Sequence, residues 1–303
     1  MVKRKSPRKG SMQFWPRKRA KSSQARIRSW PEVDGKLAGF AGYKTGMTQV
    51  QLRDNSLSVT KGEIISTPVT IIECPPLKPI SLRFYKKNQY QTKLLTEITS
   101  KQQKIIPEDY DYNTLLLQTQ PKLVSGIPKK KPETIEIFIG KIPKEQHTKI
   151  LEKEIKISDV FEEGQLVDIH AITKGKGFQG PVKRFGVRLV SHKSEKGQRR
   201  VGSLGPWNQQ QHTMFRVAHA GQTGYHTRVD YNKLLLKIGS DPKEINPKGG
   251  FLRYGLIKNE FILLKGSIPG PKKRLIKFIN SMRPNKRLIS TPEITHINLE
   301  SQQ

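Results

Sequence analysis

The stretch KLAGFAGY at Lys36–Tyr43 is the first of several short segments that decide the fold class. Each segment is rich in Val, Ile, Phe or Leu and is bounded by Gly, Pro or Asn, which is typical of β-strands. The other predicted strands are Thr67–Glu73, Ile80–Tyr85, Thr134–Ile139, Gln165–Thr173 and Leu256–Lys265. Because these strands are dispersed along the chain, they predict a β-barrel or sandwich in which early strands meet late ones.

Two segments between the strands have the periodicity of a helix. Thr92–Lys104 and Pro143–Lys156 alternate charged and apolar residues at helical spacing. Lys129–Lys131 has a proline on either side, which predicts a linker. We therefore expect residues 88–158 to form an α+β insertion and the fold class to be β-rich α+β.

The charge of the chain restricts its function. The 303 residues include 56 Lys and Arg against 25 Asp and Glu, a formal net charge of +31. A folded protein with this charge repels itself, and a bound polyanion relieves the repulsion. No apolar run approaches the roughly 18 residues that span a bilayer, so nucleic acid is favoured over a membrane. Cys74 is the only cysteine, which excludes an intrachain disulfide and fits a reducing compartment.

The positive charge is concentrated in particular segments. Residues 1–31 contain eleven basic residues and no acid, and residues 171–240 contain 13 basic residues against Glu195 and Asp230. Residues 60–165, by contrast, contain 17 basic and 14 acidic residues. Strongly basic segments bury too little apolar area to offset the entropy lost on ordering, so we expect them to become ordered on RNA.

The N-terminal segment has a second interpretation. It is rich in Arg and free of acids, as mitochondrial presequences are. Pro7, Gly10 and Pro16 interrupt the amphipathic helix that such a sequence forms. We therefore expect residues 1–31 to be a basic extension that binds RNA.

Residues 174–232 are glycine-rich and basic, with little apolar periodicity. A loop of this length is rare in a compact domain, so its charge indicates a function. Gly175–Gly180 (GKGFQG) has the spacing of a dinucleotide-binding loop, but no amphipathic helix or second parallel strand follows it. The alternatives are a simple glycine-rich turn, or a backbone that approaches phosphates while Lys174 and Lys176 neutralise them.

Histidines and tryptophans are the other candidate site residues in the basic segments. His212, His219 and His226 recur every seven residues, but a metal site needs further ligands, so we predict base or phosphate contacts instead of a metal. Trp207 and Trp15 each have two interpretations: stacking on an unpaired base, or packing on the surface of the protein.

We find no catalytic constellation in the sequence. It has no P-loop, no nucleophile elbow and no His/carboxylate pair with a plausible nucleophile, so we predict a protein that is not an enzyme and binds no cofactor. Two alternatives are an RNA-modifying enzyme that binds a cofactor at Gly175–Gly180 and a chromatin-like protein that packs DNA.

Five segments occur in the same order as in a known family. They are KLAGFAGYKTGMT (Lys36–Thr48), VDIHAITKGKGFQGPVKR (Val167–Arg184), LGPW (Leu204–Trp207), GQTGYHTR (Gly221–Arg228) and KGSIPGPKKR (Lys265–Arg274). These segments closely resemble ribosomal protein L-three, the third protein of the large subunit, and the N-terminal extension resembles its archaeal and eukaryotic branch. The resemblance covers nearly the whole chain and is weakest in residues 88–158 and at the C-terminal end.

The resemblance implies a translation-protein-type β-barrel with an inserted α/β subdomain, a long basic central finger loop and an extended N-terminal arm. The expected parts are the extension at 1–31, the barrel at 32–87, 159–173 and 233–303 (with the C-terminal tail), the insertion at 88–158 and the finger loop at 174–232. In that family the arm and finger run towards the peptidyl transferase centre, and the finger tip corresponds here to the region around Trp207.

The implied function is that of a structural constituent of the large subunit, which binds large-subunit ribosomal RNA near its 3′ end and supports early assembly in the cytoplasm. The expected partners are that RNA and neighbouring ribosomal proteins, with no membrane, small-molecule substrate or homo-oligomer. The residues predicted to bind RNA are Lys3, Arg4, Lys5, Arg8, Lys9, Trp15, Arg17, Lys18, Arg19, Lys44, Lys174, Lys176, Lys183, Arg184, Arg188, Lys193, Arg199, Arg200, Trp207, Arg216, His226, Arg228, Lys272, Lys273 and Arg274.

Overall fold

The computed structural model divides the chain into two compact units. The loop unit comprises Met1–Ser22 and Ile172–Thr227, and the strand unit comprises Ser23–Ala171 and Arg228–Gln303. The residues that the structure describes are 8–33, 35–99, 106–107, 109–140, 150–205, 212–285 and 293–300. No helix within these ranges is long and apolar enough to cross a membrane.

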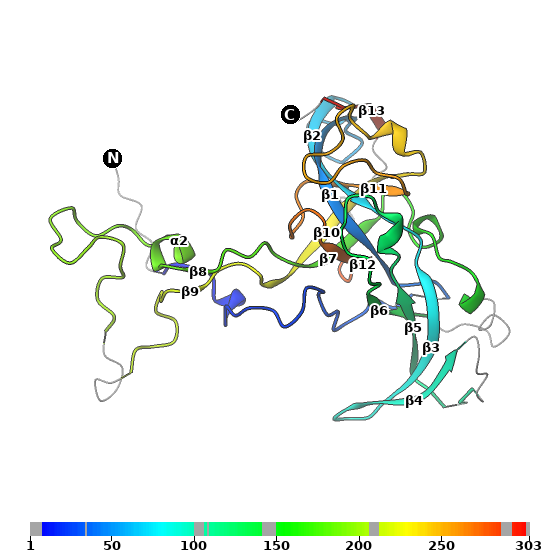
Figure 1. Cartoon of the computed structure of the whole chain (residues 1–303), viewed down its shortest axis with the longest axis horizontal. Helices are drawn as coiled ribbons and strands as arrows, with labels where there is room; N and C mark the ends of the chain where they lie inside the picture. The colour runs from blue at the N-terminus through cyan, green and yellow to red at the C-terminus, as the bar shows by residue number, and fades with distance from the viewer. Residues whose placement is uncertain are drawn as a thin grey trace. The chain divides into compact units, whose positions relative to one another are not determined.

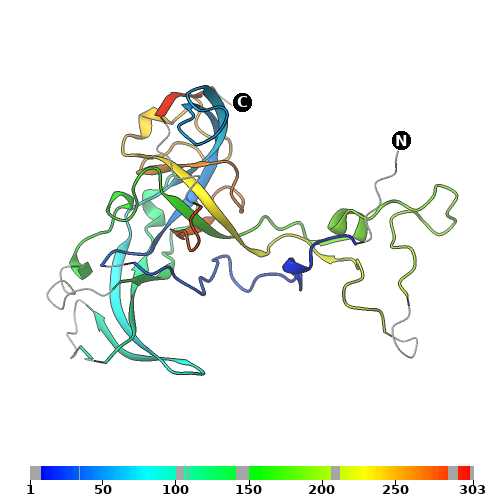
Figure 2. The same ribbon diagram turned by 180° about the vertical axis from the view of Figure 1, so that it is seen from behind.

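The larger sheet of the strand unit forms a closed circuit of hydrogen-bonded strands (Figures 1 and 2). Its strands are β1 (Gly39–Arg53), β2 (Ile64–Glu73), β7 (Leu166–Ile172), β10 (Thr227–Gly239), β11 (Phe261–Lys265), β12 (Leu275–Asn280) and β13 (Glu293–Ile297). The pairing order is β12-β7-β10-β11-β2-β1-β13, and β12 also pairs with β1. Six strands are therefore linked in a ring, to which β13 adds along the second half of β1.

Two glycines of the segment Lys36–Tyr43 allow the circuit of strands to close. A Cβ at Gly39 would lie 2.7 Å from the carbonyl oxygen of Phe278 on β12, and one at Gly42 would lie 2.6 Å from Cγ2 of Ile72 on β2. Both distances are shorter than van der Waals contact. β1 therefore lies this close to two partner strands only because both positions lack a side chain.

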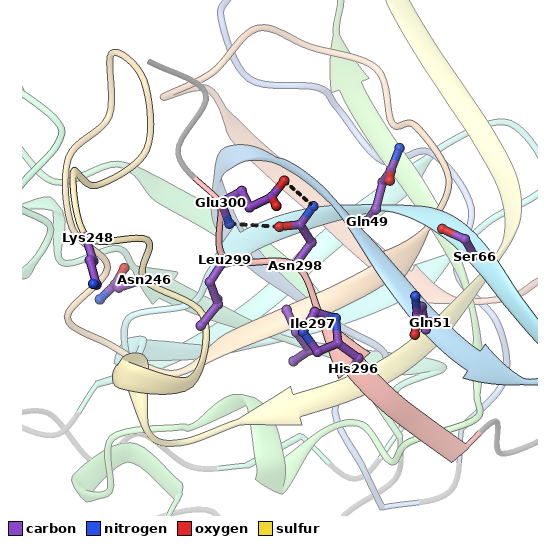
Figure 3. A pocket seen from close by; sticks show the side chains of 10 residues that line it. All are labelled: Gln49, Gln51, Ser66, Asn246, Lys248, His296, Ile297, Asn298, Leu299 and Glu300. Carbon is purple, nitrogen blue, oxygen red and sulfur yellow. Dashed lines mark hydrogen bonds between the residues drawn. The ribbon is translucent and has the colours of Figure 1, made fainter.

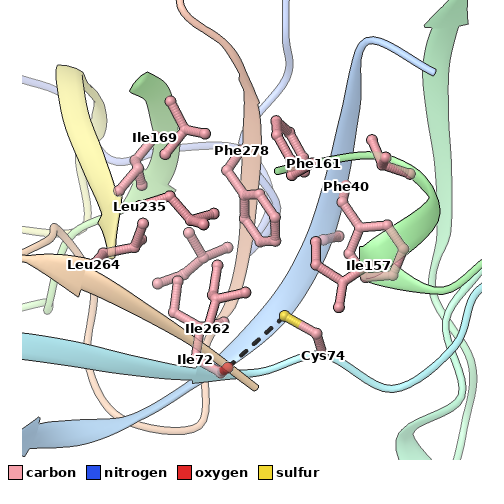
Figure 4. Packing of buried hydrophobic residues seen from close by; sticks show 14 of the residues in the cluster. Phe40, Ile72, Cys74, Ile157, Phe161, Ile169, Leu235, Ile262, Leu264 and Phe278 are labelled. Atoms are coloured by element: carbon pink, nitrogen blue, oxygen red, sulfur yellow. Dashed lines mark hydrogen bonds between the residues drawn. The ribbon is translucent and has the colours of Figure 1, made fainter. Parts of the chain in front are cut away.

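The interior of the circuit is an apolar core. Phe40, Phe161 and Phe278 are buried, with ring centroids 6.0 Å apart for Phe40–Phe278 and 5.6 Å for Phe161–Phe278. Figure 4 shows them beside aliphatic side chains from the neighbouring strands. Burying one such side chain stabilises a fold by about 1.5–3 kcal/mol. Cys74 lies in the same core, and burial raises the pKa of its thiol well above the ordinary value.

A second, four-stranded sheet has the order β4-β3-β5-β6. Its strands are β3 (Lys78–Lys87), β4 (Thr92–Thr99), β5 (Tyr112–Gln118) and β6 (Thr134–Ile139). It begins at Lys78, inside the range 32–87 that we assigned to the first part of the barrel.

The helix predicted at Thr92–Lys104 is wrong over residues 92–99. β4 pairs antiparallel with β3 there, and residues 100–104 lie outside the described residues. The threonines of this segment favour an extended backbone, and pairing with β3 overrides the helical pattern of charge. Of the predicted helix at Pro143–Lys156, residues 150–152 are helical and residues 143–149 lie outside the described part.

The other predicted strands overlap observed ones, and Thr134–Ile139 coincides with β6. The strand predicted at Leu256–Lys265 begins only at Phe261. The residues before it turn around the buried carboxylate of Glu73, which accepts hydrogen bonds from the backbone N–H groups of Lys258 and Asn259. The sequence analysis did not predict β5, β10, β12 or β13.

The loop unit contains little regular structure. Its elements are the 3-10 turn η1 (Met12–Phe14), the strands β8 (Phe178–Gln179) and β9 (Gly221–Gln222), and the helix α2 (Pro181–Phe185). The strand unit has three further 3-10 turns, η2 (Pro121–Leu123), η3 (Ile157–Asp159) and η4 (Pro242–Glu244). The shape of the loop unit must therefore depend on contacts other than a helix or sheet ladder.

Candidate nucleic-acid interface

Two arginines join the N-terminal arm to the long loop. Arg17 Nη1 donates to the carbonyl oxygen of Arg184 at 2.8 Å, and Arg184 Nη2 donates to that of Arg17 at 3.1 Å. Arg184 also donates to the carbonyl oxygens of Gln222 (3.1 Å) and His219 (2.9 Å). Partial burial lowers the pKa of both guanidinium groups, and the charge of Arg17 lowers that of Arg184 further. One residue of α2 thus connects three segments of the loop unit.

Aromatic rings reinforce this junction. Trp15 stacks on the buried Phe185 with ring centroids 5.6 Å apart and meets Phe215 edge-on at 6.3 Å. The guanidinium carbons of Arg17 and Arg184 lie 4.2 and 5.0 Å from the Phe185 ring centroid. Of the two interpretations of Trp15, the structure shows packing against the protein. A cation over an aromatic ring contributes about 0.5–1 kcal/mol at an exposed site.

The glycine-rich motif pairs with the return segment of the loop. Lys176 N donates to the carbonyl oxygen of Thr223, and Thr223 N donates to that of Gly177, both at 2.9 Å. Gly224 has a φ of +71°, and a Cβ there would lie 2.0 Å from the carbonyl oxygen of Lys174. The glycine required by this close approach therefore lies in the return segment, whereas within GKGFQG only Gly177 has a positive φ (+67°) and a helix of only five residues follows the motif.

The arm continues along this paired stem. Ala20 N donates to the carbonyl oxygen of Tyr225 at 2.9 Å, and Nδ1 of the buried His226 lies 2.9 Å from the carbonyl oxygen of Lys18. His226 therefore holds the arm, and its ring is not exposed for a base.

Many other cations of the loop unit face solvent without an acidic partner. They are exposed, and none forms an ion pair with a carboxylate of the described residues: Lys18, Arg19, Lys174, Lys176, Lys183, Arg188, Lys193, Arg199, Arg200 and Arg216. Lysine and arginine in this state neutralise phosphates and release counterions on binding. The loop unit therefore presents many cations to solvent, around and beyond the junction that Arg17 and Arg184 form.

The predicted basic residues of the strand unit differ in exposure, from the buried Lys44 to the exposed Lys273. Lys44 is buried, and its Nζ donates to the carbonyl oxygens of Ile268 (2.7 Å) and Gly270 (3.1 Å). Burial, and then the charge of Lys272, lower the pKa of Lys44. Lys272 Nζ donates to the carbonyl oxygen of Leu252 at 3.0 Å, whereas Lys273 is exposed. Lys44 thus anchors the loop that carries Lys273.

Comparison with known proteins identifies the family. Residues 1–109 and 89–303 match the model described as ribosomal protein L3. The chain is 45% identical over 329 residues to the large ribosomal subunit protein uL3 of Methanocaldococcus jannaschii, covering 98% of this chain and 97% of the relative. It is 44% identical over 325 residues to the uL3 of Archaeoglobus fulgidus, covering 98% of each. The chain belongs to the ribosomal protein L3 family. It is of the archaeal type, and the family is structural, not enzymatic.

Several residues that were predicted to bind RNA in this L3-family chain either lie outside the described residues or are partly buried. Lys3, Arg4, Lys5 and Trp207 lie outside the described residues, so their predicted contacts stay predictions. Lys9, Arg228 and Arg274 are partly buried, as is Arg8, whose Nη1 donates to the carbonyl oxygen of Arg216 at 3.2 Å. Among the residues described, no three His, Cys, Asp or Glu side chains gather as metal ligands would.

The sequence analysis missed Phe185, Phe215 and Tyr225, which give the loop unit of this L3-family chain its few packed surfaces. Phe185 is buried and is followed by Gly186, whose φ of +66° ends α2. For Phe185 and Tyr225 the available signal was an aromatic residue next to a glycine, Gly186 and Gly224 respectively, whereas Phe215 has no such neighbour.

A shallow hollow lies on the strand unit at the second half of β1 (Figure 3). Its lining residues are Gln49, Gln51, Ser66, Asn246, Lys248, His296, Ile297, Asn298, Leu299 and Glu300. Asn298 and Glu300 bond to each other, and Asn246 exchanges two hydrogen bonds with the backbone of Ile257. These amides maintain the local backbone, and the hollow lacks the dense positive charge of the loop unit.

Proposed function

We propose that this L3-family chain is a structural constituent of the large ribosomal subunit and that its loop unit binds large-subunit ribosomal RNA in the cytoplasm. The observation that carries the proposal is the set of exposed loop-unit cations without carboxylate partners among the described residues, around and beyond the junction of Arg17 and Arg184. The relatives that it matches over their full length are named as large-subunit proteins.

We further propose that the closed circuit is a translation-protein-type β-barrel, with the four-stranded sheet in its inserted subdomain. The loop at 174–232 is then the central finger, and with residues 1–31 it extends towards the peptidyl transferase centre. Binding near the 3′ end of the RNA supports early assembly. The pairing order of the strands and the hydrogen bonds between arm and loop support this proposal.

Within this proposal the predicted RNA contacts divide into two groups. The exposed cations, such as Lys174, Lys176 and Lys183, contact phosphates, whereas Arg17, Arg184 and the buried Lys44 hold the protein itself in shape. Trp207 stays our candidate for stacking on an unpaired base at the finger tip.

The test is binding to fragments of large-subunit ribosomal RNA over a salt series, with transfer RNA and duplex DNA as competitors. We expect a 3′-proximal fragment to remain bound at salt concentrations that release both competitors. Equal binding to all three, lost together as salt rises, contradicts a specific ribosomal RNA site and leaves only general attraction to polyanions.

A matched pair of triple variants locates the interface. Changing Lys174, Lys176 and Lys183 to Gln should lower the slope of log K against log salt by roughly two to three. The control changes Lys122, Lys130 and Lys131, which are exposed on the strand unit, and removes the same charge. Equal loss of slope in both variants would show that the loop unit is not the binding surface.

A further inference from the structure

The hairpin between β1 and β2 exposes an apolar tip. Leu57 is 84% exposed and Val59 is fully exposed, and Ile64, at the start of β2, is 61% exposed. Single exposed apolar side chains are normal on protein surfaces, but here three lie within eight residues of one hairpin and form an apolar patch at its tip. In water this patch is unfavourable, and burial against a partner would relieve it.

The loop that carries these side chains is held in one shape. The buried carboxylate of Asp54 accepts hydrogen bonds from Ser56 N (2.9 Å), Ser58 Oγ (2.8 Å) and Thr60 Oγ1 (2.7 Å). The Asp54 backbone closes the base of the loop, because its N–H donates to Glu63 and its carbonyl accepts from Gly62. Bonds from Ser56 and Thr60 hold the pKa of Asp54 below its ordinary value, so the carboxylate stays charged near neutral pH.

This internal bonding bears on binding. A loop fixed in one shape loses little entropy when it docks, so apolar contacts at its tip translate efficiently into affinity. The hydrogen bonds of Asp54 lie within the hairpin, whereas Leu57 and Val59 make the surface that faces outward.

The charge of the hairpin selects the class of partner. The exposed charges of its loop, Lys61 and Glu63, cancel, because the Asp54 carboxylate is buried and bonded within the loop. The tip therefore carries no net charge within a chain whose net charge is +31. A surface that binds RNA is enriched in cations, and an exposed carboxylate such as Glu63 is repelled by phosphates. An apolar tip without net positive charge fits an apolar pocket on a protein better than the phosphates of an RNA surface.

We propose that the hairpin tip, formed by Leu57, Val59 and Ile64, docks into an apolar pocket on another protein of the large subunit. The inference rests on the proposed function, because the partner belongs to the same particle. It assigns a protein contact to a part of the chain that carries no predicted RNA-binding residue.

A photoreactive benzophenone amino acid at position 57 of the full-length chain tests the inference in purified large subunits. Illumination should join the chain to one ribosomal protein, identified by mass spectrometry of the crosslinked peptide. The same amino acid at position 123, where Leu123 is 43% exposed, serves as the control for general proximity and should not give that crosslink.

Each outcome has a distinct meaning. A crosslink from position 57 to RNA, or no crosslink in subunits that contain the chain, overturns the docking surface alone. If the chain does not enter large subunits, the proposed function fails and the inference fails with it.

A double variant tests the apolar contact itself. With the benzophenone at position 64, changing Leu57 and Val59 to Ser should abolish the protein crosslink, whereas Leu123→Ser should leave it unchanged. Binding of each variant to the RNA fragment over the salt series verifies folding, since the substituted side chains are exposed. An undiminished crosslink in the double variant would overturn the proposal.

Discussion

The strand unit and the loop unit are stabilised by different means. The strand unit buries phenylalanine and aliphatic side chains inside a closed circuit of strands. In the described part of the loop unit, only Ile172, Phe185, Gly224 and His226 are buried. The loop unit relies instead on arginine donors that satisfy backbone carbonyls and on rings stacked beside them. The same residue type therefore acts as a structural donor at Arg184 and remains available to phosphates at Arg188.

The energies indicate what each unit can do without RNA. A hydrogen bond from a charged donor contributes about 1.5–3 kcal/mol, whereas ordering one residue costs about 1–2 kcal/mol of backbone entropy. A few such bonds define a junction but do not order a long loop. We therefore infer that the arm–loop junction forms in the free protein and that RNA orders the segments beyond it.

The largest expected effect is loss of core packing in the strand unit. Phe278→Ala should lower the free energy of unfolding by about 3–5 kcal/mol, measured by urea denaturation, because it leaves a cavity among Phe40 and Phe161. Phe185→Ala should change that global value much less and instead speed proteolysis of the loop unit. Equal losses would mean that the two units share one cooperative core.

Removing the arginine junction should release the arm. Arg184→Ala removes donors to three carbonyl oxygens, and we expect a local loss of about 1.5–3 kcal/mol, measured as weaker hydrogen-exchange protection at Ala20 and Lys176. Arg184→Lys should not restore protection, since an ammonium cannot reproduce the planar fork of a guanidinium. Full rescue by lysine would show that charge alone holds the arm.

A buried lysine gives the strand unit a distinct pH dependence. Burial lowers the pKa of Lys277 to about 8, so between about pH 8 and 10 the unfolded chain binds more protons than the folded one. Stability from this group therefore rises with pH across that window. The free energy of unfolding of the wild type should gain on the order of 1–3 kcal/mol relative to Lys277→Met. A difference that stays constant from pH 8 to 10 would contradict a depressed pKa.

The smallest effect on the structure is expected for Lys183, the residue that precedes Arg184 in the sequence. Lys183→Ala should leave hydrogen-exchange protection of the free protein unchanged, because the exposed ammonium forms no ion pair with a described carboxylate. It should lower the slope of log K for RNA against log salt by about one. If Lys183→Ala weakened hydrogen-exchange protection as much as Arg184→Ala, Lys183 would also be a structural residue, contrary to the prediction.

The sequence by itself determined the β-rich class, the concentration of positive charge and the family. The glycines of KLAGFAGY also marked where β1 approaches its partners. The first two features follow from composition and local spacing, and the family follows from the five segments that resemble it. Local helical periodicity predicted the wrong structure for Thr92–Thr99, because the antiparallel partner β3 supplies hydrogen bonds that no local pattern reveals.

Only the tertiary structure decided which cations are internal. Lys183 and Arg184 are adjacent and belong to the same charge class, yet one faces solvent and the other bonds to the carbonyl oxygen of Arg17, 167 residues earlier. The sequence predicts that Lys44 binds RNA, and only the fold shows that its Nζ donates to the carbonyl oxygens of Ile268 and Gly270. A cation becomes structural when distant segments place carbonyl oxygens around it, and that arrangement exists only in the folded chain.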